Sequence, residues 1–394
     1  MRRMAMRKLT VVQLVPALEA GGVERSTLEI GAALAAAGHR SIVVSAGGRM
    51  VERLEAQGSE HIRIDIGRKS IVTLRHVWTL RRLLRNLQPD IVHARSRLPA
   101  WIGWRALQGL RARRPHFVTT VHGRNSPSRY SAILTRGERV ICVSESLRAF
   151  VLKHYPRLDP QRIRVIPRGI DISEFPRGHQ PDAAWRARFA HEFPQLQDGR
   201  LLVLPGRGTR LKGHRAAIEL LAGLRQRGVD ARLLLLGARE VGREAYIGEL
   251  ETLAYHRGVA AQLAITPPRA DVRAIYASAD LVLQLSQKAE SFGRTVVEAL
   301  ALGRPVLGYA HGGVGELLAE LYPAGAVLPG DVRGLLERAM DLLRVAPQVP
   351  PFEKYRLAHM QAATLALYAE VVAQNTFSSN RFIVGGEGRG EGGS

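Results

Sequence analysis

Cysteine, aromatic side chains and long apolar runs are all scarce in this sequence of 394 residues. Cys142 is the single cysteine, which excludes a disulfide framework and a metal cluster held by cysteines. No stretch reaches the ~18 uninterrupted apolar residues that a membrane span needs. These absences predict a chain that folds in a reducing compartment and crosses no membrane, so we expect a cytoplasmic location.

The N-terminal segment also lacks the pattern of a secretory signal. Basic residues precede the apolar run at 11–18, but this run is short and contains Gln13 and Pro16. It leads into Gly21 and Gly22, as a buried first strand leads into a glycine-rich turn. We therefore expect no cleaved leader.

Acidic residues are few in the first part of the chain. Residues 1–170 hold 31 Lys and Arg against 11 Asp and Glu, a net charge of +20, whereas residues 171–394 hold 26 against 24, a net charge of +2. A generally basic composition would raise the charge of both parts alike. The one-sided charge predicts an anionic partner for the first part, which could be phospholipid, the phosphates of lipid A or nucleic acid.

Patterns typical of strands and helices alternate along the chain and restart near residue 200, after a Pro- and Gly-rich stretch at 176–181. Such alternation predicts an α/β protein with two Rossmann-like, doubly wound parallel sheets facing a cleft. We predict four parts: an N-terminal Rossmann-like domain at 1–175, a C-terminal Rossmann-like domain at 176–350, a helix at 351–374 that crosses back to the first domain, and a disordered or vector-derived tail at 375–394.

The strongest candidate for a functional site is the segment Glu-Ser-Phe-Gly-Arg-Thr-Val-Val-Glu at 290–298. Glu290 follows an expected strand at 281–285, and Glu298 lies in the helix that comes next. The backbone N–H groups of Gly293, Arg294 and Thr295 at the start of that helix suit a diphosphate. The alternative is two surface glutamates on an amphipathic helix.

A second candidate is the glycine-rich loop at 204–213, between an expected strand and a helix. Arg207 and Lys212 in this loop could neutralise a diphosphate leaving group without a metal ion. The alternative is a solvated basic loop.

Two weaker candidates follow strands of the first domain. Gly21 and Gly22 lack the full spacing of a dinucleotide-binding turn, so a turn that exposes N–H groups, or a plain structural turn, fits better. His122, in Thr-Val-His-Gly, could donate a hydrogen bond or position a substrate hydroxyl. A single histidine is more often part of the core, and His93 and His311 are weaker candidates still.

Seven motifs occur together in the order known from one family. They are Gly-Gly-Val-Glu at 21–24, Pro-Asp-Ile-Val-His at 89–93, Val-His-Gly at 121–123, Val-Ser-Glu-Ser at 143–146, Val-Ile-Pro-Arg-Gly-Ile-Asp at 165–171, Pro-Gly-Arg with Lys-Gly at 205–213, and Glu-x7-Glu at 290–298. From about Leu9 to Gln374 the chain resembles glycosyltransferase family 4. This is a retaining class with the GT-B fold, which includes lipopolysaccharide core glycosyltransferases and phosphatidylinositol mannosyltransferases.

The resemblance implies a role for each matching residue. Arg207 and Lys212 would bind the donor diphosphate, Glu290 the transferred sugar and Glu298 the ribose. His122 would lie near the reacting end of the sugar. The other expected donor-binding positions are Gly22, Gly237, Ser291, Phe292, Gly293, Arg294 and Thr295.

The resemblance also implies chemistry without a cofactor or a divalent metal. No Asp-x-Asp triplet, the usual metal-nucleotide motif of the other glycosyltransferase fold, occurs in the sequence. The acceptor hydroxyl would attack from the front face and lose its proton to the departing phosphate. The expected donor is a UDP-sugar first and GDP-mannose second. The chain departs from the family pattern at Arg168, where Asn is commoner, and at Gly208, where a larger residue is commoner.

The basic first domain would receive the acceptor and attach to an anionic membrane surface. Two tryptophans one helical turn apart lie among arginines in the segment 101–114. The alternative is that the tryptophans belong to the core. The residues expected on this side are Trp101, Trp104, Arg105, Arg111, Arg113 and Arg114. A glycan or lipid-linked acceptor, such as a growing lipopolysaccharide core, and peripheral attachment to the inner face of the cytoplasmic membrane are then expected.

Three other functions remain open from the sequence. A GT-B nucleotide-sugar epimerase has the same two domains, and a starch- or sucrose-synthase-like enzyme uses a soluble acceptor. A basic nucleic-acid-binding protein is a third possibility, given the sequence pI of about 11.1. No zinc motif, recognition helix or interleaved aromatic-basic stripe supports it, so nucleic acid is not the expected partner.

Overall fold

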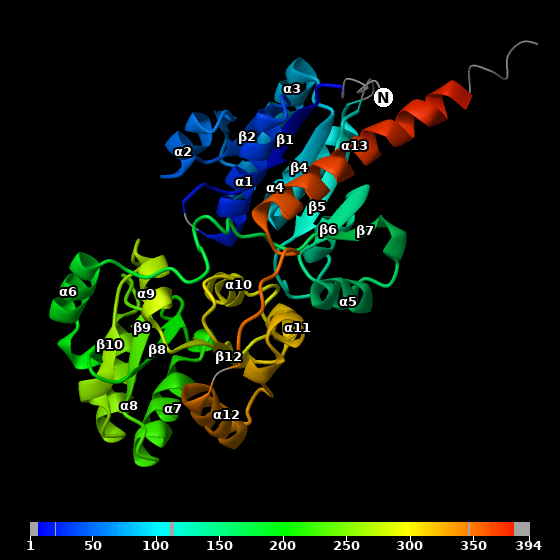
Figure 1. The fold of residues 1–394 in the computed structure, drawn as a ribbon. Coiled ribbons are helices and arrows are strands. Elements are labelled where there is room, and N and C mark those ends of the chain that lie inside the picture. The colour runs from blue at the N-terminus through cyan, green and yellow to red at the C-terminus, as the bar shows by residue number, and fades with distance from the viewer. Residues whose placement is uncertain (1–6, 20, 111–113, 346, 382–394) are drawn as a thin grey trace, which may run out of the picture. The chain divides into compact units, whose positions relative to one another are not determined.

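The computed structural model describes residues 7–19, 21–110, 114–345 and 347–381. Its residues form two compact units (Figure 1). The first unit comprises the chain up to Val143, residues 148–166 and the chain from Ala358 onward. The second comprises residues 144–147 and 167–357. Among the described residues, no helix is both long and apolar enough to cross a membrane.

The first unit is built on a sheet of seven parallel strands in the order β3-β2-β1-β4-β5-β6-β7. β1 lies in the middle, where Val12 pairs with Ile42 on one side and Val92 on the other. Both faces of the central strands are buried, as expected when helices cover a parallel sheet. The strands are β1 (Thr10–Leu14), β2 (Arg40–Ser45), β3 (Glu60–Arg63), β4 (Ile91–Ala94), β5 (His116–Val121), β6 (Arg139–Cys142) and β7 (Ile163–Val165).

Helices connect these strands and cover the sheet of the first unit (Figure 1). They are α1 (Gly22–Ala36), α2 (Val51–Ala56), α3 (His76–Leu87), α4 (Arg97–Gln108), α5 (Glu145–His154) and α13 (Leu357–Arg381), with 3-10 helices η1 (Ile71–Arg75), η2 (Ser131–Thr135) and η3 (Pro160–Arg162). The strand expected at 62–66 is β3 and begins earlier. Its pairing with β2 ends at Arg63, although Ile64 and Ile66 are buried.

The second unit repeats this plan with six parallel strands in the order β10-β9-β8-β11-β12-β13. Its strands are β8 (Arg200–Pro205), β9 (Ala231–Leu236), β10 (Leu263–Ile265), β11 (Leu281–Gln284), β12 (Val306–Tyr309) and β13 (Ala326–Val327). Its helices are α6 (Ala183–Glu192), α7 (His214–Gln226), α8 (Glu244–His256), α9 (Val272–Ser278), α10 (Arg294–Ala301), α11 (Gly312–Leu321) and α12 (Val332–Arg344), with 3-10 helices η4 (Pro194–Leu196), η5 (Arg210–Lys212), η6 (Ala260–Gln262) and η7 (Pro323–Gly325).

The chain passes from the first unit to the second between Ile166 and Pro167, earlier than the boundary expected at 175. The reason is that residues after 167 pack on the end of the second unit's own chain. Ile170 forms a β-bridge with Arg356, and a Cβ on Gly169 would lie 2.5 Å from the Cα of Leu357. The Pro- and Gly-rich stretch also packs on this unit, since the N–H of Gly178 donates to the carbonyl of Leu302.

Helix α13 belongs to the first unit and is held by buried polar contacts. The hydroxyl of Tyr368 lies 2.6 Å from Nδ1 of His93, whose Nε2 lies 2.6 Å from Oγ1 of Thr120. Arg139 forms an ion pair with Glu370 at 2.8 Å. Helix α13 continues to Arg381, so residues 375–381 of the expected tail are drawn as helix. The rest of that tail, residues 382–394, lies outside the described residues.

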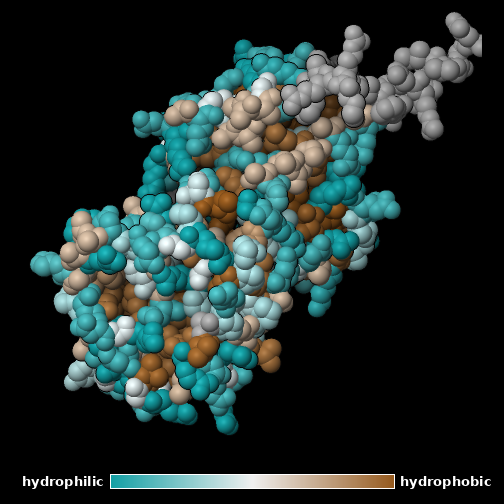
Figure 2. Space-filling view, viewed as in Figure 1, coloured by the Kyte–Doolittle hydropathy of each residue, from teal (hydrophilic) through white to brown (hydrophobic). Residues whose placement is uncertain are grey.

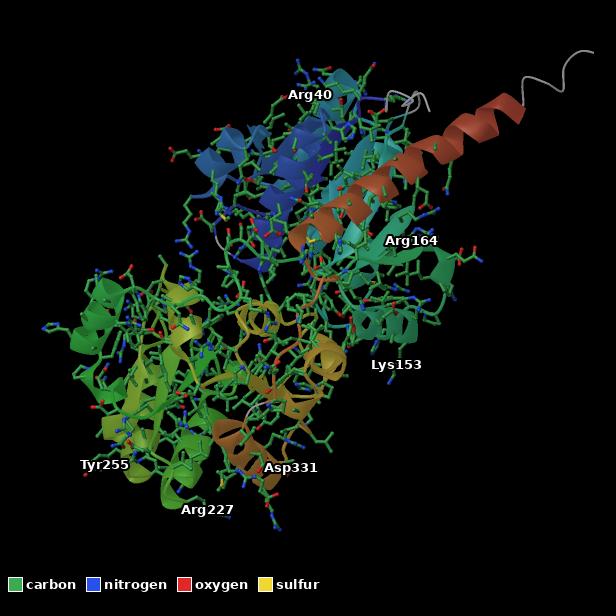
Figure 3. The ribbon with its side chains drawn as sticks, in the orientation of Figure 1. Arg40, Lys153, Arg164, Arg227, Tyr255 and Asp331 are labelled. Carbon is green, nitrogen blue, oxygen red and sulfur yellow. The ribbon has the colours of Figure 1, made fainter. Side chains whose placement is uncertain are left out.

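Hydrophilic side chains dominate the face of each unit seen in Figure 2, with hydrophobic side chains in small groups between them. Figure 3 shows how many long side chains project outward from both units, for example Arg40 and Lys153 in the first, and Arg227 and Tyr255 in the second. The face of each unit seen in this view is therefore an ordinary polar surface.

Candidate functional site

The second unit has a switch point between β8 and β11. These two strands are neighbours in the sheet, but the chain continues from β8 toward β9 and from β11 toward β12, on opposite sides. Loops that leave in opposite directions open a crevice at the carboxyl ends of the strands, which is where open α/β sheets bind ligands. The two strongest sequence candidates are the loops that follow these two strands.

Glycines allow the loop after β8 to pack closely on the loop after β11. Gly213 has a φ of 83°, and a Cβ there would lie 2.0 Å from the carbonyl oxygen of Leu285. The N–H of Gln287 donates to the carbonyl of Leu211 at 2.8 Å, which ties the two loops together. Gly208 is one of the two departures from the family pattern, and the structure explains why a glycine stands at this position. A Cβ there would lie 2.2 Å from the carbonyl oxygen of Ala238, so a larger residue would not fit.

Lys212 and Glu290 meet where the two loops join. The Nζ of Lys212 lies 2.6 Å from Oε1 of Glu290, and both side chains are partly exposed. The hydroxyl oxygen of Ser286 lies 2.5 Å from the same carboxylate oxygen. Oε1 of Gln284, the last residue of β11, lies 2.8 Å from the same hydroxyl oxygen, so this single O–H is directed to either Glu290 or Gln284. A cation and a carboxylate are thus presented together at the switch point.

Arg207 lies on the same loop but points into solvent. It is exposed, and no carboxylate within the described ranges forms an ion pair with it. Arg210, three residues further on, differs because it pairs with Glu249 at 2.5 Å and lies over the ring of Tyr246. Arg207 is therefore available for an anionic ligand at this edge of the sheet.

Helix α10 begins at this site. Gly293, its N-cap, has a φ of 119° and no side chain to cap the helix, so the N–H groups of the first turn lack the usual intrahelical acceptors. Such a helix start attracts anions through its aligned N–H groups and dipole. Phe292 is buried against the ring of Tyr355, so its side chain belongs to the core and only its backbone borders the site. Ser291 is partly exposed in the same turn.

Glu298 lies one turn into α10 and is almost fully buried. Its Oε1 accepts from Nε of Arg294 at 3.1 Å. Burial, together with the nearby Glu298 carboxylate, raises the pKa of Tyr276. Thr295, on the same helix, accepts a hydrogen bond from Nε2 of Gln284 at 3.1 Å. The first turns of α10 are therefore connected to the end of β11 by polar side chains.

A neighbouring turn contains Gly237, at the end of β9. Gly237 has a φ of 79°, and its N–H donates to Oγ1 of Thr266 at 3.4 Å. The N–H of Arg239 donates to the carbonyl of Thr266 at 2.9 Å. The turns after β9 and β10 thus lie together, and the first of them contains Gly237, one of the expected donor-binding positions.

Two polar groups at the site were not predicted from the sequence. Ser286 is buried, and its hydroxyl contacts Glu290. Its backbone carbonyl accepts a hydrogen bond from Nε2 of His311 at 2.8 Å. His214, the first residue of α7, is fully buried. Burial, partly offset by the nearby backbone of Gly206 and Thr209, lowers the pKa of His214 to about 4. In the sequence, only the closeness of Ser286 and His214 to the motif residues could have indicated that they belong to the site.

The remaining predicted donor residues lie in the first unit. Gly22 is the first residue of α1 and follows β1, and a Cβ on it would meet no atom within 4 Å. His122 is partly buried and follows β5 directly. His122 thus lies at the carboxyl end of β5, and Gly22 lies at the start of the helix that follows β1.

The predicted membrane-facing tryptophans lie on α4 and are half-buried. Trp101 and Trp104 pack edge to face at 5.8 Å, and Nε1 of Trp101 donates to the carbonyl of Tyr130 at 3.0 Å. Arg105 lies 5.2 Å from the ring centre of Trp104. Arg114 is exposed, and Arg111 and Arg113 lie outside the described residues. The tryptophans are therefore packed against their own unit.

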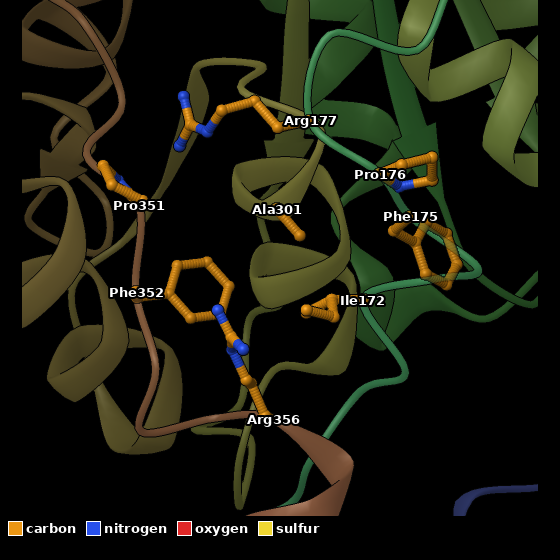
Figure 4. A pocket seen from close by; sticks show the side chains of 8 residues that line it. All are labelled: Ile172, Phe175, Pro176, Arg177, Ala301, Pro351, Phe352 and Arg356. Atoms are coloured by element: carbon orange, nitrogen blue, oxygen red, sulfur yellow. The ribbon is translucent and has the colours of Figure 1, made fainter.

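A cavity of about 290 Å³ opens at the other end of α10 (Figure 4). Ala301, the last residue of that helix, lies on its wall, roughly 10 Å along the axis from Arg294. The lining is mostly apolar, with two guanidinium groups: Ile172, Phe175, Pro176, Arg177, Ala301, Pro351, Phe352 and Arg356. The cavity is thus separate from the site at Lys212 and Glu290.

Two family models match this chain and together define its class. The model described as Glycosyltransferase Family 4 matches residues 20–174, and the model described as Glycosyl transferases group 1 matches residues 187–348. A solved glycosyltransferase from Rickettsia africae ESF-5 has a TM-score of 0.80 at 24% identity, covering 93% of this chain and 99% of its own. Two parallel α/β sheets with this match define the GT-B fold. The chain belongs to the family 4 type of GT-B glycosyltransferases.

Two further proteins are similar to this chain. HepE from Anabaena, solved in complex with UDP-glucose, has a TM-score of 0.72 at 19% identity, covering 94% of this chain and 100% of its own. A D-inositol 3-phosphate glycosyltransferase from Xylanimonas cellulosilytica is 29% identical over 275 residues, which are 64% of this chain and 61% of that protein. The match therefore spans about three fifths of the curated relative's length.

Proposed function

We propose that this protein is a retaining glycosyltransferase that moves a hexose from a nucleotide-sugar to a glycan or lipid-linked acceptor. The observation that carries the proposal is the meeting of Lys212 and Glu290 at the switch point of the second sheet. A cation beside a helix start suits a diphosphate, and a carboxylate beside them suits sugar hydroxyls.

In this proposal the loop cations stabilise the leaving group. Arg207 and Lys212 take up the negative charge that develops on the diphosphate when the bond to the sugar breaks, and the first turn of α10 supplies N–H groups to the same phosphates. No divalent metal or other cofactor is needed for that step. Glu290 orients the sugar and Glu298 the ribose. When a donor binds, the ammonium of Lys212 is shared between Glu290 and the phosphate.

The first unit would complete the reaction centre. Gly22 brings backbone N–H groups toward the phosphates, and His122 hydrogen-bonds the sugar near its reacting carbon. The acceptor hydroxyl attacks from the side that the diphosphate leaves, and its proton passes to the departing phosphate oxygen. The new bond then keeps the donor's anomeric configuration.

A UDP-sugar is the donor that we propose first, and GDP-mannose second. The solved HepE complex with UDP-glucose supports this order. The test is a thermal-shift screen of the native chain against UDP, GDP and their sugars. A nucleotide that binds the folded chain at about 100 times its Kd adds about 2.7 kcal/mol to the free energy of unfolding. No shift with any nucleotide would contradict the donor site.

The acceptor that we propose is lipid-linked, such as a lipopolysaccharide core or another cell-envelope glycan, used at the inner face of the cytoplasmic membrane. The net charge of +20 on residues 1–170 supports an anionic partner. An inositol phosphate is a second candidate, because the curated relative is named for it. Transfer of radiolabelled sugar to lipid extracts, to envelope glycans or to inositol phosphate separates these acceptors, and NMR of the product gives the anomeric configuration.

A nucleotide-sugar epimerase remains the alternative, because it would need the same donor site but no acceptor. In the same radiolabel assay an epimerase leaves all label in soluble sugar of changed configuration. Label on a lipid or a glycan contradicts the epimerase, and its complete absence from every acceptor contradicts the transferase.

A further inference from the structure

One segment of the first unit has many cations and no carboxylate. Between Asp65 and Asp90 the sequence contains Arg68, Lys69, Arg75, Arg81, Arg82 and Arg85 but no Asp or Glu. The segment forms η1 and α3, and α3 packs against α4 (Figure 1). Its positive charge is therefore concentrated on two consecutive elements.

Exposed apolar side chains lie in the same segment. Val72 is 55% exposed, Leu74 59% and Trp78 69%. Soluble proteins rarely expose several large apolar side chains so close together in the sequence. Such groups mark interaction sites.

The helical spacing places Trp78 among cations. Trp78, Arg82 and Arg85 follow each other at i, i+4 and i+7, which is one face of α3. Leu80 and Leu84 lie on the opposite face and are fully buried. Helix α3 thus presents a tryptophan and arginines outward while its leucines hold it to the unit.

The outward cations are not neutralised by the protein itself. Arg68, Lys69, Arg75, Arg82 and Arg85 are all exposed, and none forms an ion pair within the part of the chain that the structure describes. Arg81 differs from these cations because its guanidinium is bound to backbone carbonyls of its own unit. It donates to the carbonyls of Arg105 and Ala106 near the end of α4, at 3.1 and 3.2 Å, so it belongs to the packing of the two helices.

We propose that these side chains form the surface by which the protein docks on an anionic phospholipid bilayer. We call them the 68–85 patch, which consists of Arg68, Lys69, Val72, Leu74, Arg75, Trp78, Arg82 and Arg85. Trp78, Val72 and Leu74 enter the interface between headgroups and acyl chains, and the cations contact lipid phosphates. The inference rests on the proposed function only in that a lipid-linked acceptor gives the attachment its purpose.

A bilayer fits the patch better than nucleic acid does. Nucleic acid would use the cations and could stack a base on Trp78, but it offers no apolar volume for Val72 and Leu74. Hydrocarbon stabilises aliphatic and aromatic side chains alike. Trp78 is more exposed than the half-buried Trp101 and Trp104, whose rings pack on each other while Trp101 donates to the backbone carbonyl of Tyr130.

Co-flotation of the full chain with phosphatidylglycerol vesicles tests the proposal, with phosphatidylcholine vesicles and a DNA duplex as separate arms. Each basic residue at the surface contributes about fivefold to binding. We therefore expect the double variant R82E/R85E to weaken binding to anionic vesicles by at least about 25-fold. The matched control R186E/R227E changes the net charge equally on exposed arginines of the second unit and should leave binding within about twofold, because those residues are not part of the patch.

Trp78→Ala should weaken binding by about tenfold or more, since it removes one large apolar side chain from the interface. Tyr255→Ala, which removes an aromatic ring that is 76% exposed in the second unit, is its control (Figure 3). A third variant locates the inserted ring. Lipids brominated on their acyl chains should quench the fluorescence of the native chain, which has 4 tryptophans, and Trp78→Phe should lose most of that quenching while it still binds.

Several results would overturn the docking surface. These are no flotation of the native chain at low salt, equal loss in both double variants, tighter binding to the DNA duplex than to anionic vesicles, or unchanged quenching in Trp78→Phe. The thermal shift with UDP is measured on every variant. If it persists while flotation fails, the patch is wrong and the donor site stands. Flotation of a native chain that shows no thermal shift with any nucleotide contradicts the proposed function alone.

Discussion

The two units share one strand order and treat charge in opposite ways. In the second unit several described arginines have a carboxylate beside them, such as Arg225 with Asp230 and Arg257 with Glu219, both at 2.7 Å. In the first unit the cations of the 68–85 patch have none among the described residues. Residues 171–394 are thus close to neutral in sum, with a net charge of +2, whereas the 68–85 patch gathers cations without ion pairs on two consecutive elements of the first unit. The difference indicates that a small ligand belongs to the second unit and an extended anionic partner to the first.

The largest expected effect tests the small site of the second unit. Lys212→Ala and Glu290→Ala should each reduce kcat by at least ~10², because preorganised charge at a leaving group is typically worth that much. The folded state should survive, since both side chains are partly exposed. Steady-state kinetics with the donor found by thermal shift provide the measurement.

Arg210→Ala is the matched control for Lys212→Ala. Arg210 lies on the same 3-10 helix, but its guanidinium is directed to Glu249 rather than to Glu290. Its removal should change kcat by less than about threefold. If Arg210→Ala costs as much activity as Lys212→Ala, the site depends on the net charge of the loop and not on the contact with Glu290.

The next effect is a pH dependence of the stability of the second unit, caused by His214. The pKa of His214 is lowered by burial to about 4, against 6.5 for a free imidazole. Between these values the unfolded chain takes up a proton that the folded chain does not, so the free energy of unfolding falls as the pH falls from about 6.5 to 4, by up to about 3 kcal/mol. Above pH 6.5 this group has no effect.

Replacing His214 by Phe should make that part of the stability curve flatter. The measurement is the denaturant midpoint of both proteins at pH 7, 5.5 and 4.5, followed by a probe in the second unit such as the fluorescence of Trp185 in variants without the other tryptophans. Equal slopes for the two proteins would mean that another group, such as His39 or His61 of the first unit, causes the acid sensitivity.

A smaller effect is expected in the first unit, where α13 is fastened. Tyr368→Phe removes the hydroxyl that lies 2.6 Å from Nδ1 of His93 and leaves a buried ring nitrogen without that partner. Such a loss costs about 1–3 kcal/mol. Hydrogen exchange should show faster exchange in α13 and β4, while the UDP shift of the second unit stays unchanged. If exchange becomes faster in α10 and not in α13, the contact between Tyr368 and His93 is not what holds α13 to the first unit.

The site could be predicted to a large extent because it depends on short segments. Glycines, cations and carboxylates that directly follow buried strands must gather at one sheet edge, whatever the rest of the chain does. Lys212 and Glu290 were found in this way, and the structure brings them together at 2.6 Å. Ser286 was missed because a serine at the end of a strand has no distinctive pattern.

The membrane side could not be predicted equally well, because exposure depends on which helix covers which. Trp78 and Trp101 both lie among arginines on amphipathic helices. Only the packing of α4 against Tyr130 separates the half-buried ring from the exposed one. The end of α13 was missed for a related reason. Its last residues have little apolar periodicity of their own, and the helix is fixed by earlier contacts such as that of Tyr368.

The last prediction compares the same substitution at corresponding glycines of the two units. Gly22 follows β1 and Gly213 follows β8, each beside the helix that comes after the first strand of its sheet. A Cβ on Gly213 would lie 2.0 Å from a backbone oxygen at a φ of 83°, whereas a Cβ on Gly22 would meet nothing within 4 Å. Gly213→Ala should therefore lower the melting temperature clearly, and Gly22→Ala should change stability by less than about 0.5 kcal/mol.

Activity separates two reasons for the glycine at position 22. If the donor phosphates approach the backbone there, the methyl group of Gly22→Ala obstructs them, and KM for the donor should rise at least about tenfold while the melting temperature stays the same. Unchanged KM together with unchanged stability would mean that Gly22 is a plain turn residue. The donor site would then consist of groups from the second unit, and the likeness between the two sheets would extend to strand order but not to phosphate binding.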